Sequence, residues 1–377
     1  MRKQIKRLVS AFPEVDLTHV IRSPKQFAHS LSEYTRIYTA GRDAIFFACR
    51  GLRLEAGVPV WLPSFHCGVE VQAILDAGAV AGFYRIRPDL SVDENDLLRK
   101  LDAQPGPVLL IHYFGFPQPG TRRIAAQCSA RKIPLIEDCA HALFSRHEGT
   151  PLGDFAPIAI YSFRKTLPVY DGGGLRVQQG RIPAESSRGF ECPELSSAAD
   201  GLMRLFKDLG RRTAGPMLTR LYRRARFGAE SRSREQVRAN TVIPEVRSYG
   251  TGISKLSRRI ASQADPLKIV ESRRRNWSAL AARVQAPKVF SCLGEGICPL
   301  FFPIWVKNRA KVIATLADSG VETFVFGEFA HPLLPLDEYP ETKRMRDDIL
   351  CLPLHQRLRP VDLRYAGAAL ERALSPL

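Results

Sequence analysis

The sequence lacks the long apolar runs that are typical of membrane proteins. No stretch reaches the roughly 18 consecutive apolar residues that a membrane-spanning helix needs. The basic N-terminus, residues 1–7, is followed by an apolar run only from Leu8 to Phe12, which is too short for the core of a secretory signal. We therefore expect a cytoplasmic protein with no membrane partner.

Cysteine pairs are also absent. The eight cysteines form no CxxC pair, and no histidine lies near them at a spacing typical of zinc ligands. Several lie inside apolar runs, as Cys139 and Cys351 do, where a thiol behaves as a small apolar side chain. The sequence predicts buried, reduced cysteines, with neither a disulfide framework nor a metal site.

Acidic residues are scarce relative to basic ones, 38 against 55, which gives a net charge of +17. Most of the surplus lies between Arg204 and Arg275, where 19 Lys or Arg face 6 Asp or Glu. Such a stretch can bind nucleic acid or an anionic membrane surface, or it can form polar helix faces near an anionic substrate such as a nucleotide diphosphate. No helix-turn-helix, zinc-finger or RNA-binding signature accompanies it. We therefore favour the second interpretation and expect no nucleic-acid partner.

The first half of the chain alternates short apolar runs with amphipathic stretches. Helical spacing predicts helices at about 45–52, 69–77, 94–101 and 121–130. Apolar runs predict strands at 58–62, 80–86, 107–111, 133–136 and 156–161. This alternation predicts an α/β fold with a mostly parallel sheet between helices.

The alternation weakens after about residue 180. Residues 200–235 have an arginine-rich helical pattern, and a long helical pattern covers about 253–284. Strands are predicted at 300–306 and 322–325, with a helix at 309–318 between them. We expect an N-terminal arm at 1–35, a large α/β domain at 36–245 that includes a basic helical stretch at about 200–245, and a smaller C-terminal α+β domain at 246–377.

The densest group of reactive side chains follows the strand predicted at 156–161. Ser162, Arg164 and Lys165 come directly after it, and three glycines follow at 172–174. A lysine that forms a Schiff base needs an amine that is neutral part of the time, which burial and a neighbouring cation favour. The alternative is a surface lysine at a strand end followed by a glycine turn.

Two further sites carry polar groups at the ends of elements. Asp138 ends an apolar strand, where a carboxylate is costly unless it is paired; a pyridinium nitrogen is a suitable partner, and capping of the next helix is the alternative. Gly41 and Arg42 begin the first helix, whose free N–H groups suit a phosphate. Asp43 can equally be a first-turn acid favoured by the helix dipole.

Together, in this order and spacing, these segments resemble the DegT/DnrJ/EryC1/StrS family of sugar aminotransferases. The matching segments are 41–44, 60–65, 112–115, 136–141, 162–174 and, late in the chain, 350–355. The resemblance covers about 38–177 and returns at about 345–370. It implies the pyridoxal-phosphate fold type I, with a seven-stranded type of sheet in the large domain.

The resemblance also implies pyridoxal 5'-phosphate as cofactor and assigns the roles around it. Lys165 would form the Schiff base and move the proton, Asp138 would hold the pyridine nitrogen, and His141 would lie near the ring and its phenolic oxygen. The phosphate would be bound by the backbone of Gly41 and Arg42 and the hydroxyl of Ser162.

Three positions depart from the family pattern. Ser162 precedes the lysine by three residues, whereas the family usually has five. Cys67 stands where the family has an aromatic residue, so Phe65 or His66 would stack on the cofactor instead. Arg42 replaces a common threonine, and its long cationic side chain can still reach a phosphate oxygen.

The function implied by the resemblance is transfer of an amino group from an amino acid, with glutamate as the expected donor, to a nucleotide-linked keto sugar in polysaccharide or sugar biosynthesis. A homodimer with its active site at the interface is implied too. The arginines that would reach a phosphate or substrate site of the partner, unless they are solvated helix faces, are Arg224, Arg226, Arg273, Arg274 and Arg275. Other pyridoxal-phosphate chemistry, or a non-catalytic binding or regulatory role, are the alternatives.

Overall fold

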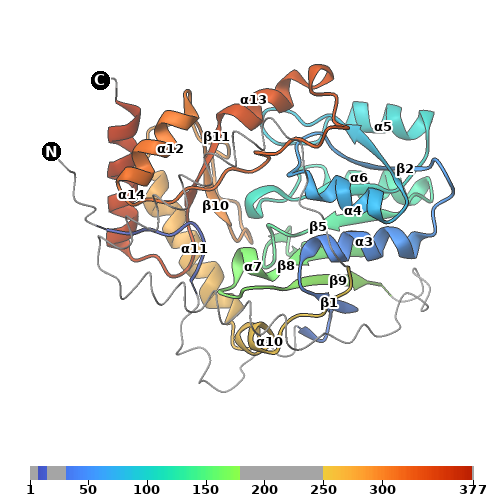
Figure 1. The fold of residues 1–377 in the computed structure, drawn as a ribbon, viewed down its shortest axis with the longest axis horizontal. Helices are drawn as coiled ribbons and strands as arrows, with labels where there is room; N and C mark the ends of the chain where they lie inside the picture. Colours follow the sequence, from blue (N-terminus) through green and yellow to red (C-terminus); the bar gives the residue numbers. More distant parts are fainter. Residues whose placement is uncertain (1–6, 15–30, 179–248, 376–377) are drawn as a thin grey trace.

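The computed structural model describes residues 7–14, 31–178 and 249–375. A seven-stranded sheet, with strand order β1-β9-β8-β5-β4-β2-β3, forms the centre of the larger part (Figure 1). The predicted helical stretch at 200–245 and most of the predicted N-terminal arm lie outside the described residues. No helix in the described residues has the length and apolar content required to span a membrane.

Five neighbouring strands of the large sheet are parallel, as the buried apolar runs predict. These are β2 (Pro59–Pro63), β3 (Val80–Tyr84), β4 (Val108–Ile111), β5 (Leu135–Asp138) and β8 (Ile158–Ser162). The antiparallel β9 (Gly173–Val177) lies next to β8, and β1 (Arg36–Tyr38) pairs antiparallel with β9 and forms the edge of the sheet. The mostly parallel α/β sheet is confirmed.

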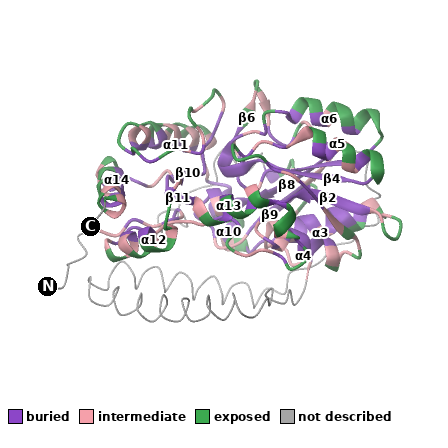
Figure 2. Cartoon of the chain, turned by 90° about the horizontal axis from the view of Figure 1, so that it is seen from above, coloured by how far each residue is buried: buried purple, intermediate pink, exposed green. Residues whose placement is uncertain are grey.

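Helices cover both faces of this sheet (Figure 2). They are α3 (Gly41–Leu52) and α4 (Val69–Asp76) on one face, and α5 (Glu94–Ala103) and α6 (Thr121–Ala130) on the other. Each turns its buried side to the sheet and its exposed side outward. Parallel strands buried on both faces bring their carboxyl ends to one edge, which is where ligands bind in open α/β sheets.

A smaller unit lies beside the sheet (Figures 1 and 2). Its two antiparallel strands are β10 (Phe301–Trp305) and β11 (Ile349–Pro353). Its helices are α10 (Lys255–Ala261), α11 (Pro266–Ala281), α12 (Arg309–Asp318), α13 (Pro340–Asp348) and α14 (Pro360–Leu374). Residues 7–14 also pack here, because Val9 bridges to Val321 and Phe12 contacts the rings of Phe301 and Phe324.

Two of the helices and strands predicted for the C-terminal part of the chain are wrong. The helix predicted at about 253–284 is interrupted, since Asp265 caps a new helix that begins at Pro266. Proline lacks an N–H and fits the first helical position, so it starts α11 rather than continuing α10. The strand predicted at 322–325 is reduced to an isolated bridge from Phe324 to Cys351.

Candidate active site

The polar strand ends that the sequence singles out meet at one edge of the large sheet. Asp138 is the last residue of β5 and is paired in register with Ile160 of the neighbouring parallel strand β8. Ser162 ends β8, and the short helix α7 (Phe163–Thr166) carries Lys165 directly after it. Parallel pairing of β5 with β8 therefore brings the acid and the lysine to the same side of the sheet.

Asp138 lies in a buried position close to the lysine amine. Its side chain is 4% exposed, and Oδ1 accepts a hydrogen bond from the backbone N–H of Ala140 at 2.8 Å. Burial raises the pKa of the Asp138 carboxyl to about 6, and the positive charge of Lys165 opposes that rise. Desolvation disfavours the ionised form, so this acid is poised to gain a cationic partner. Residues 139–145 form turns and no helix, so the helix-cap alternative is wrong, and the bond to Ala140 stabilises a turn.

The His141 ring has a fixed tautomer and an unused donor. The backbone N–H of Phe114, in η1 (Tyr113–Gly115), donates to Nδ1 of His141 at 3.3 Å. The neutral ring therefore carries its proton on Nε2, and this buried atom has no hydrogen-bond partner. Burial, with the nearby charge of Lys165, lowers the pKa of His141 well below its ordinary value. A neutral imidazole with an open N–H can serve as a donor to a bound ligand.

The N-terminus of α3 lies against the strand that follows the lysine turn. Its cap residue, Ala40, has no side-chain oxygen with which to accept a bond from the first helical N–H groups. A Cβ on Gly173 would lie 2.2 to 2.4 Å from backbone atoms of Ala40 and Gly41, so only glycine permits this approach. On the other side, a Cβ on Gly41 would lie 3.7 Å from the Cβ of Ser162. The structure thus places Gly41 and Ser162, two of the three residues predicted to bind phosphate, next to each other.

Arg42 follows Gly41 in α3, and its Nε is buried without a hydrogen-bond partner. The two aromatic candidates are packed differently. Phe65 is fully buried between the rings of Tyr113 and Phe326. The ring of His66 stacks on Phe83, and its Nδ1 bonds the carbonyl of Pro63 at 2.9 Å. Both rings are held by protein contacts, and their predicted stacking on a cofactor stays a prediction.

Cys67 directly follows His66, and the charge of Lys165 acts on the pKa of its thiol. Its thiol donates to both carboxylate oxygens of Glu70, at 3.0 and 3.1 Å. Burial and the charge of Glu70 raise the pKa of the Cys67 thiol, while Lys165 opposes the rise. Arg346 from α13 bonds the carbonyl of His66 at 3.0 Å, and its Nη2 is buried without a partner. Sequence reasoning missed Glu70 and Arg346, because a charged residue in a helix pattern reads as a solvated face.

A buried trio next to the site, His112, Glu137 and Cys139, has donor atoms within 4.8 Å of one another. The first two residues already use theirs. Nδ1 of His112 accepts the N–H of Gln118 at 3.1 Å, so Nε2 carries the proton and donates to Glu137 at 2.9 Å. Glu137 also accepts three backbone N–H groups of residues 153, 155 and 156. The trio is a structural network, and its hydrogen bonds leave no lone pairs arranged for a metal.

Arg273 fits neither interpretation offered for the basic stretch. It is fully buried within its own chain, and its guanidinium binds backbone carbonyls of residues 166, 299 and 300. Arg274 is partly buried and bonds the carbonyls of Gly294 and Ile297, whereas Arg275 is exposed. Arg224 and Arg226 lie outside the described residues.

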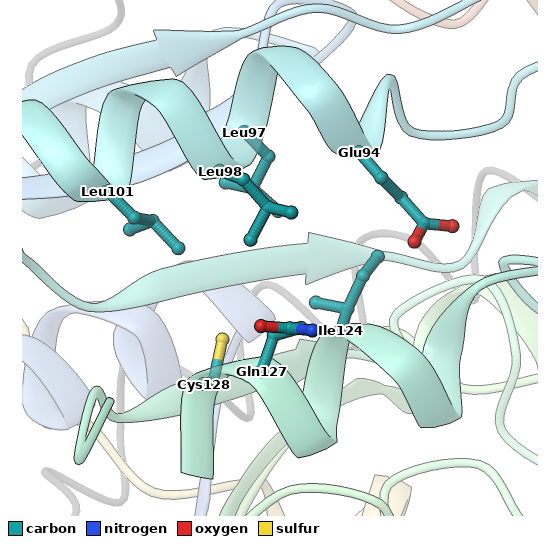
Figure 3. Close-up of a pocket in the computed structure, with 7 residues that line it drawn as sticks. All are labelled: Glu94, Leu97, Leu98, Leu101, Ile124, Gln127 and Cys128. Atoms are coloured by element: carbon teal, nitrogen blue, oxygen red, sulfur yellow. The ribbon is translucent and has the colours of Figure 1, made fainter. Parts of the chain in front are cut away.

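A shallow pocket between α5 and α6 lies apart from this site (Figure 3). Its walls are mainly the apolar side chains of Leu97, Leu101, Ile124 and Cys128, and none of the predicted site residues lines it. It is a gap in the outer helical layer and contributes no chemistry.

Comparison with known proteins agrees with this geometry. Residues 8–191 match the DegT/DnrJ/EryC1/StrS aminotransferase family. Just under half of the chain is therefore similar to this family. The match contains β5, β8 and the lysine turn, which are the elements that form the candidate site.

Curated relatives in the family align with less than half of the chain. A dTDP-4-dehydro-2,3,6-trideoxy-D-glucose 4-aminotransferase from Saccharopolyspora spinosa is 35% identical over 39% of this chain and 40% of its own length. A GDP-perosamine synthase from Vibrio cholerae is 27% identical over 41% of this chain and 43% of its own length. The chain thus spans well under two thirds of the curated relatives it matches.

Solved structures extend the likeness in fold to nearly the whole chain. Helicobacter pylori PseC, an aminotransferase involved in the biosynthesis of pseudoaminic acid, superposes with a TM-score of 0.70 at 12% identity and covers 99% of each chain. The aminotransferase TlmJ from Streptoalloteichus hindustanus gives a TM-score of 0.68 at 20% identity, over 97% of this chain and 99% of that one. The fold of these aminotransferases is therefore that of this chain, including the smaller unit where sequence similarity is thin.

Proposed function

We propose that this chain is a pyridoxal-phosphate-dependent aminotransferase that transfers an amino group from an amino acid to a nucleotide-linked keto sugar. The observation that carries the proposal is the position of the buried Asp138 and the half-buried Lys165 at the same edge of the sheet. Asp138 ends β5, and Lys165 lies in α7 directly after the neighbouring parallel strand β8; the lysine charge acts on an acid whose pKa burial has raised to about 6. An acid and an amine so placed suit the opposite ends of one aromatic cofactor.

Three features of the described residues fit pyridoxal phosphate. The Asp138 carboxyl is desolvated and is stabilised in its ionised form by a cation, which a protonated pyridine nitrogen would provide. The unpartnered Nε2–H of His141 can donate to a phenolic oxygen. The start of α3, with no capping side chain and with Ser162 beside it, can bind a phosphate through backbone N–H groups.

When bound, the cofactor would supply an aldehyde for the amine of Lys165 and an electron sink for the carbanion of the substrate. Lys165 would hold the cofactor through its amine and would act as the proton carrier. Asp138 would keep the ring nitrogen protonated. The N–H of Phe114 would keep the proton of His141 on Nε2, facing the ligand.

The substrate class is inferred from the names of the relatives. A dTDP-linked sugar and a GDP-linked sugar appear in the names of the two curated relatives above. We infer that the amino acceptor is a nucleotide-linked keto sugar, that glutamate is the donor, and that two copies of the chain form the working enzyme. Both substrates are metabolites of the cytoplasm, which is the compartment that this proposal implies.

The proposal is tested by the visible spectrum of the purified protein after addition of pyridoxal phosphate. We expect a visible absorbance band that disappears on addition of glutamate and returns on addition of a nucleotide-linked keto sugar. Borohydride should fix the cofactor on the protein, and mass spectrometry of peptides should locate it at Lys165.

Lys165→Ala is the decisive variant, with Lys311→Ala on the exposed side of α12 as its control. We expect the first to lose the fixed label and to lower turnover by roughly 10³-fold or more, as removal of a nucleophile and proton carrier does. The control should match the wild type. A wild-type protein that neither binds the cofactor nor is labelled at position 165 would overturn the proposal.

A further inference from the structure

Arg273 is a fully buried cation with no carboxylate partner among residues 7–14, 31–178 and 249–375. Burial lowers the pKa of this guanidinium to about 10, so it remains charged at neutral pH. Burying a charge is costly unless its donors are all used. The groups that accept its hydrogen bonds therefore show which segments this side chain holds in place.

Its first acceptor lies in the turn that carries the lysine. Nη2 of Arg273 donates to the carbonyl of Thr166 at 3.1 Å, and Thr166 directly follows Lys165. The same carbonyl accepts a second bond, at 3.0 Å, from Nε2 of Gln356. Gln356 is itself oriented by Arg273, whose Nε donates to its Oε1 at 3.0 Å. Two side chains of the smaller unit thus hold one carbonyl of the lysine turn.

Its other acceptors lead to the histidine. Nη1 of Arg273 donates to the carbonyls of Pro299 and Leu300, at 3.2 and 3.0 Å. The N–H of Leu300 donates to the carbonyl of Phe114 at 2.7 Å, and the N–H of Phe114 donates to His141. One guanidinium therefore connects the lysine turn to the turn that sets the tautomer of His141.

We propose that Arg273 is a positioning residue that fixes the turns of Lys165 and His141 relative to each other. This inference rests on the proposed function. Only a planar fork with five N–H groups reaches carbonyls on two separate segments at once. Lysine retains the charge and loses this geometry, whereas methionine loses both. The smaller unit, through α11, thereby sets the direction in which the lysine amine approaches its partner.

The test compares Arg273→Lys and Arg273→Met with Asn276→Ala. Asn276 is buried on the same helix and bonds the carbonyls of Leu354 and His355, away from the lysine turn. Each protein is loaded with pyridoxal phosphate. The measurements are the urea midpoint, the rate of borohydride labelling at Lys165, the circular dichroism of the visible band, kcat and KM.

We expect Arg273→Met and Arg273→Lys to lower kcat on the order of 100-fold, as a displacement of about 1 Å in a reacting group does, with KM for the donor changed less than about threefold. The circular dichroism per bound cofactor should change as well. Asn276→Ala should lower the urea midpoint and leave kcat and the visible circular dichroism as in the wild type.

If Arg273→Met does not fold, Arg273→Lys and Gln356→Leu still decide the question. Gln356→Leu removes one of the two donors to Thr166 and should lower kcat by roughly tenfold. Folded Arg273→Lys and Gln356→Leu proteins that label, absorb and turn over like the wild type would overturn the inference. A wild type that fails to label at Lys165 would instead overturn the proposed function, so the two failures are distinguishable.

Discussion

In each half of the described chain, a fully buried charged side chain bonds several backbone groups around it. In the large sheet, Glu137 accepts hydrogen bonds from three backbone N–H groups and from His112. In the smaller unit, Arg273 donates to three backbone carbonyls and to Gln356. Glu137 stabilises a loop next to its own strand, whereas Arg273 holds a turn more than 100 residues away in the sequence.

Under the proposed function, the candidate reactive residues lie in the larger part, and Arg273 of the smaller unit would orient the turn that carries the lysine. The reactive residues that the family pattern identifies all lie in the larger part, on strand ends and on one helix start. None of the residues predicted to bind the cofactor of its own chain lies in the smaller unit, yet Arg273 of its helix α11 reaches the lysine turn. This unit can keep its fold while its sequence similarity is poor. A few side chains are enough to hold backbone carbonyls, and every residue type has a backbone carbonyl.

The largest effect on stability is expected from Glu137→Ala. Four buried donors would lose their acceptor at once, and each unpaired group costs about 1 to 3 kcal/mol. We expect the free energy of unfolding to fall by roughly 4 kcal/mol or more, measured by urea unfolding. Glu94→Ala is the control, because Glu94 forms an ion pair with Arg123, which is largely exposed, and should cost less than about 1 kcal/mol.

Equal losses in these two variants would break the comparison between the halves. The loop at 153–156 would then be held by its packing, and Glu137 would not be the counterpart of Arg273. The folded fraction of Glu137→Ala should also show faster proteolysis within that loop, since its N–H groups would be released.

A smaller effect on the free energy of unfolding is expected at Asp138, where removal of the charge should stabilise the protein. Burial raises its pKa to about 6 in the folded protein, against an ordinary value of 3.8. The unfolded chain therefore loses this proton first as the pH rises, and stability falls between about pH 4 and pH 6 and stays lowered above it. At about 1.4 kcal/mol per pKa unit, the penalty is on the order of 3 kcal/mol at pH 8.

Asp138→Asn should accordingly stabilise the cofactor-free protein at pH 8 and have little effect near pH 4, as measured by urea unfolding at both values. The asparagine oxygen can still accept the N–H of Ala140, so the local turn is retained. The same variant should hold pyridoxal phosphate less tightly, because the pyridinium loses its counter-ion. A variant that is less stable than the wild type at pH 8 would show that the ionised acid is already compensated within the protein.

Sequence reasoning succeeded where a local pattern decides the outcome. Helix α6 at 121–130 and helix α12 at 309–318 begin and end as predicted, because their apolar spacing and flanking residues are unambiguous. Asp138 and Ser162 stand at the carboxyl ends of neighbouring strands, as the alternation of strands and helices predicts. These features depend on residues close together in the chain.

Contacts between distant segments could not be read in the same way. The tautomer of His141 depends on the N–H of Phe114, and the burial of Arg346 depends on its contact with His66. For Arg273 a signal was present. It lies four residues after Ile269 and four before Trp277, on the buried stripe of α11, where a solvated arginine is not expected.

The smallest expected effect on stability comes from replacing glycine with alanine, a change that can be made in both halves of the molecule. Gly367 lies inside helix α14, and an added Cβ would meet only Arg283, at 3.8 Å or more. Since alanine is favoured over glycine in a helix by about 1 kcal/mol, Gly367→Ala should stabilise the protein by up to that amount and leave turnover unchanged. Thermal unfolding and kcat are the measurements.

Gly173→Ala should act in the opposite direction. Its Cβ would overlap the backbone of Ala40 and Gly41, which cannot yield as a flexible side chain can. We expect a loss of roughly 1 to 3 kcal/mol, as overpacking produces, together with weaker cofactor binding because the start of α3 moves. If Gly173→Ala is as stable as the wild type and binds pyridoxal phosphate equally well, the close approach of β9 to α3 is not what shapes the phosphate end of the site. A gain in stability for Gly367→Ala together with a loss for Gly173→Ala would show that different factors decide at the two glycines. Close backbone packing would decide at Gly173, beside the proposed phosphate site, and helix propensity would decide at Gly367, away from it.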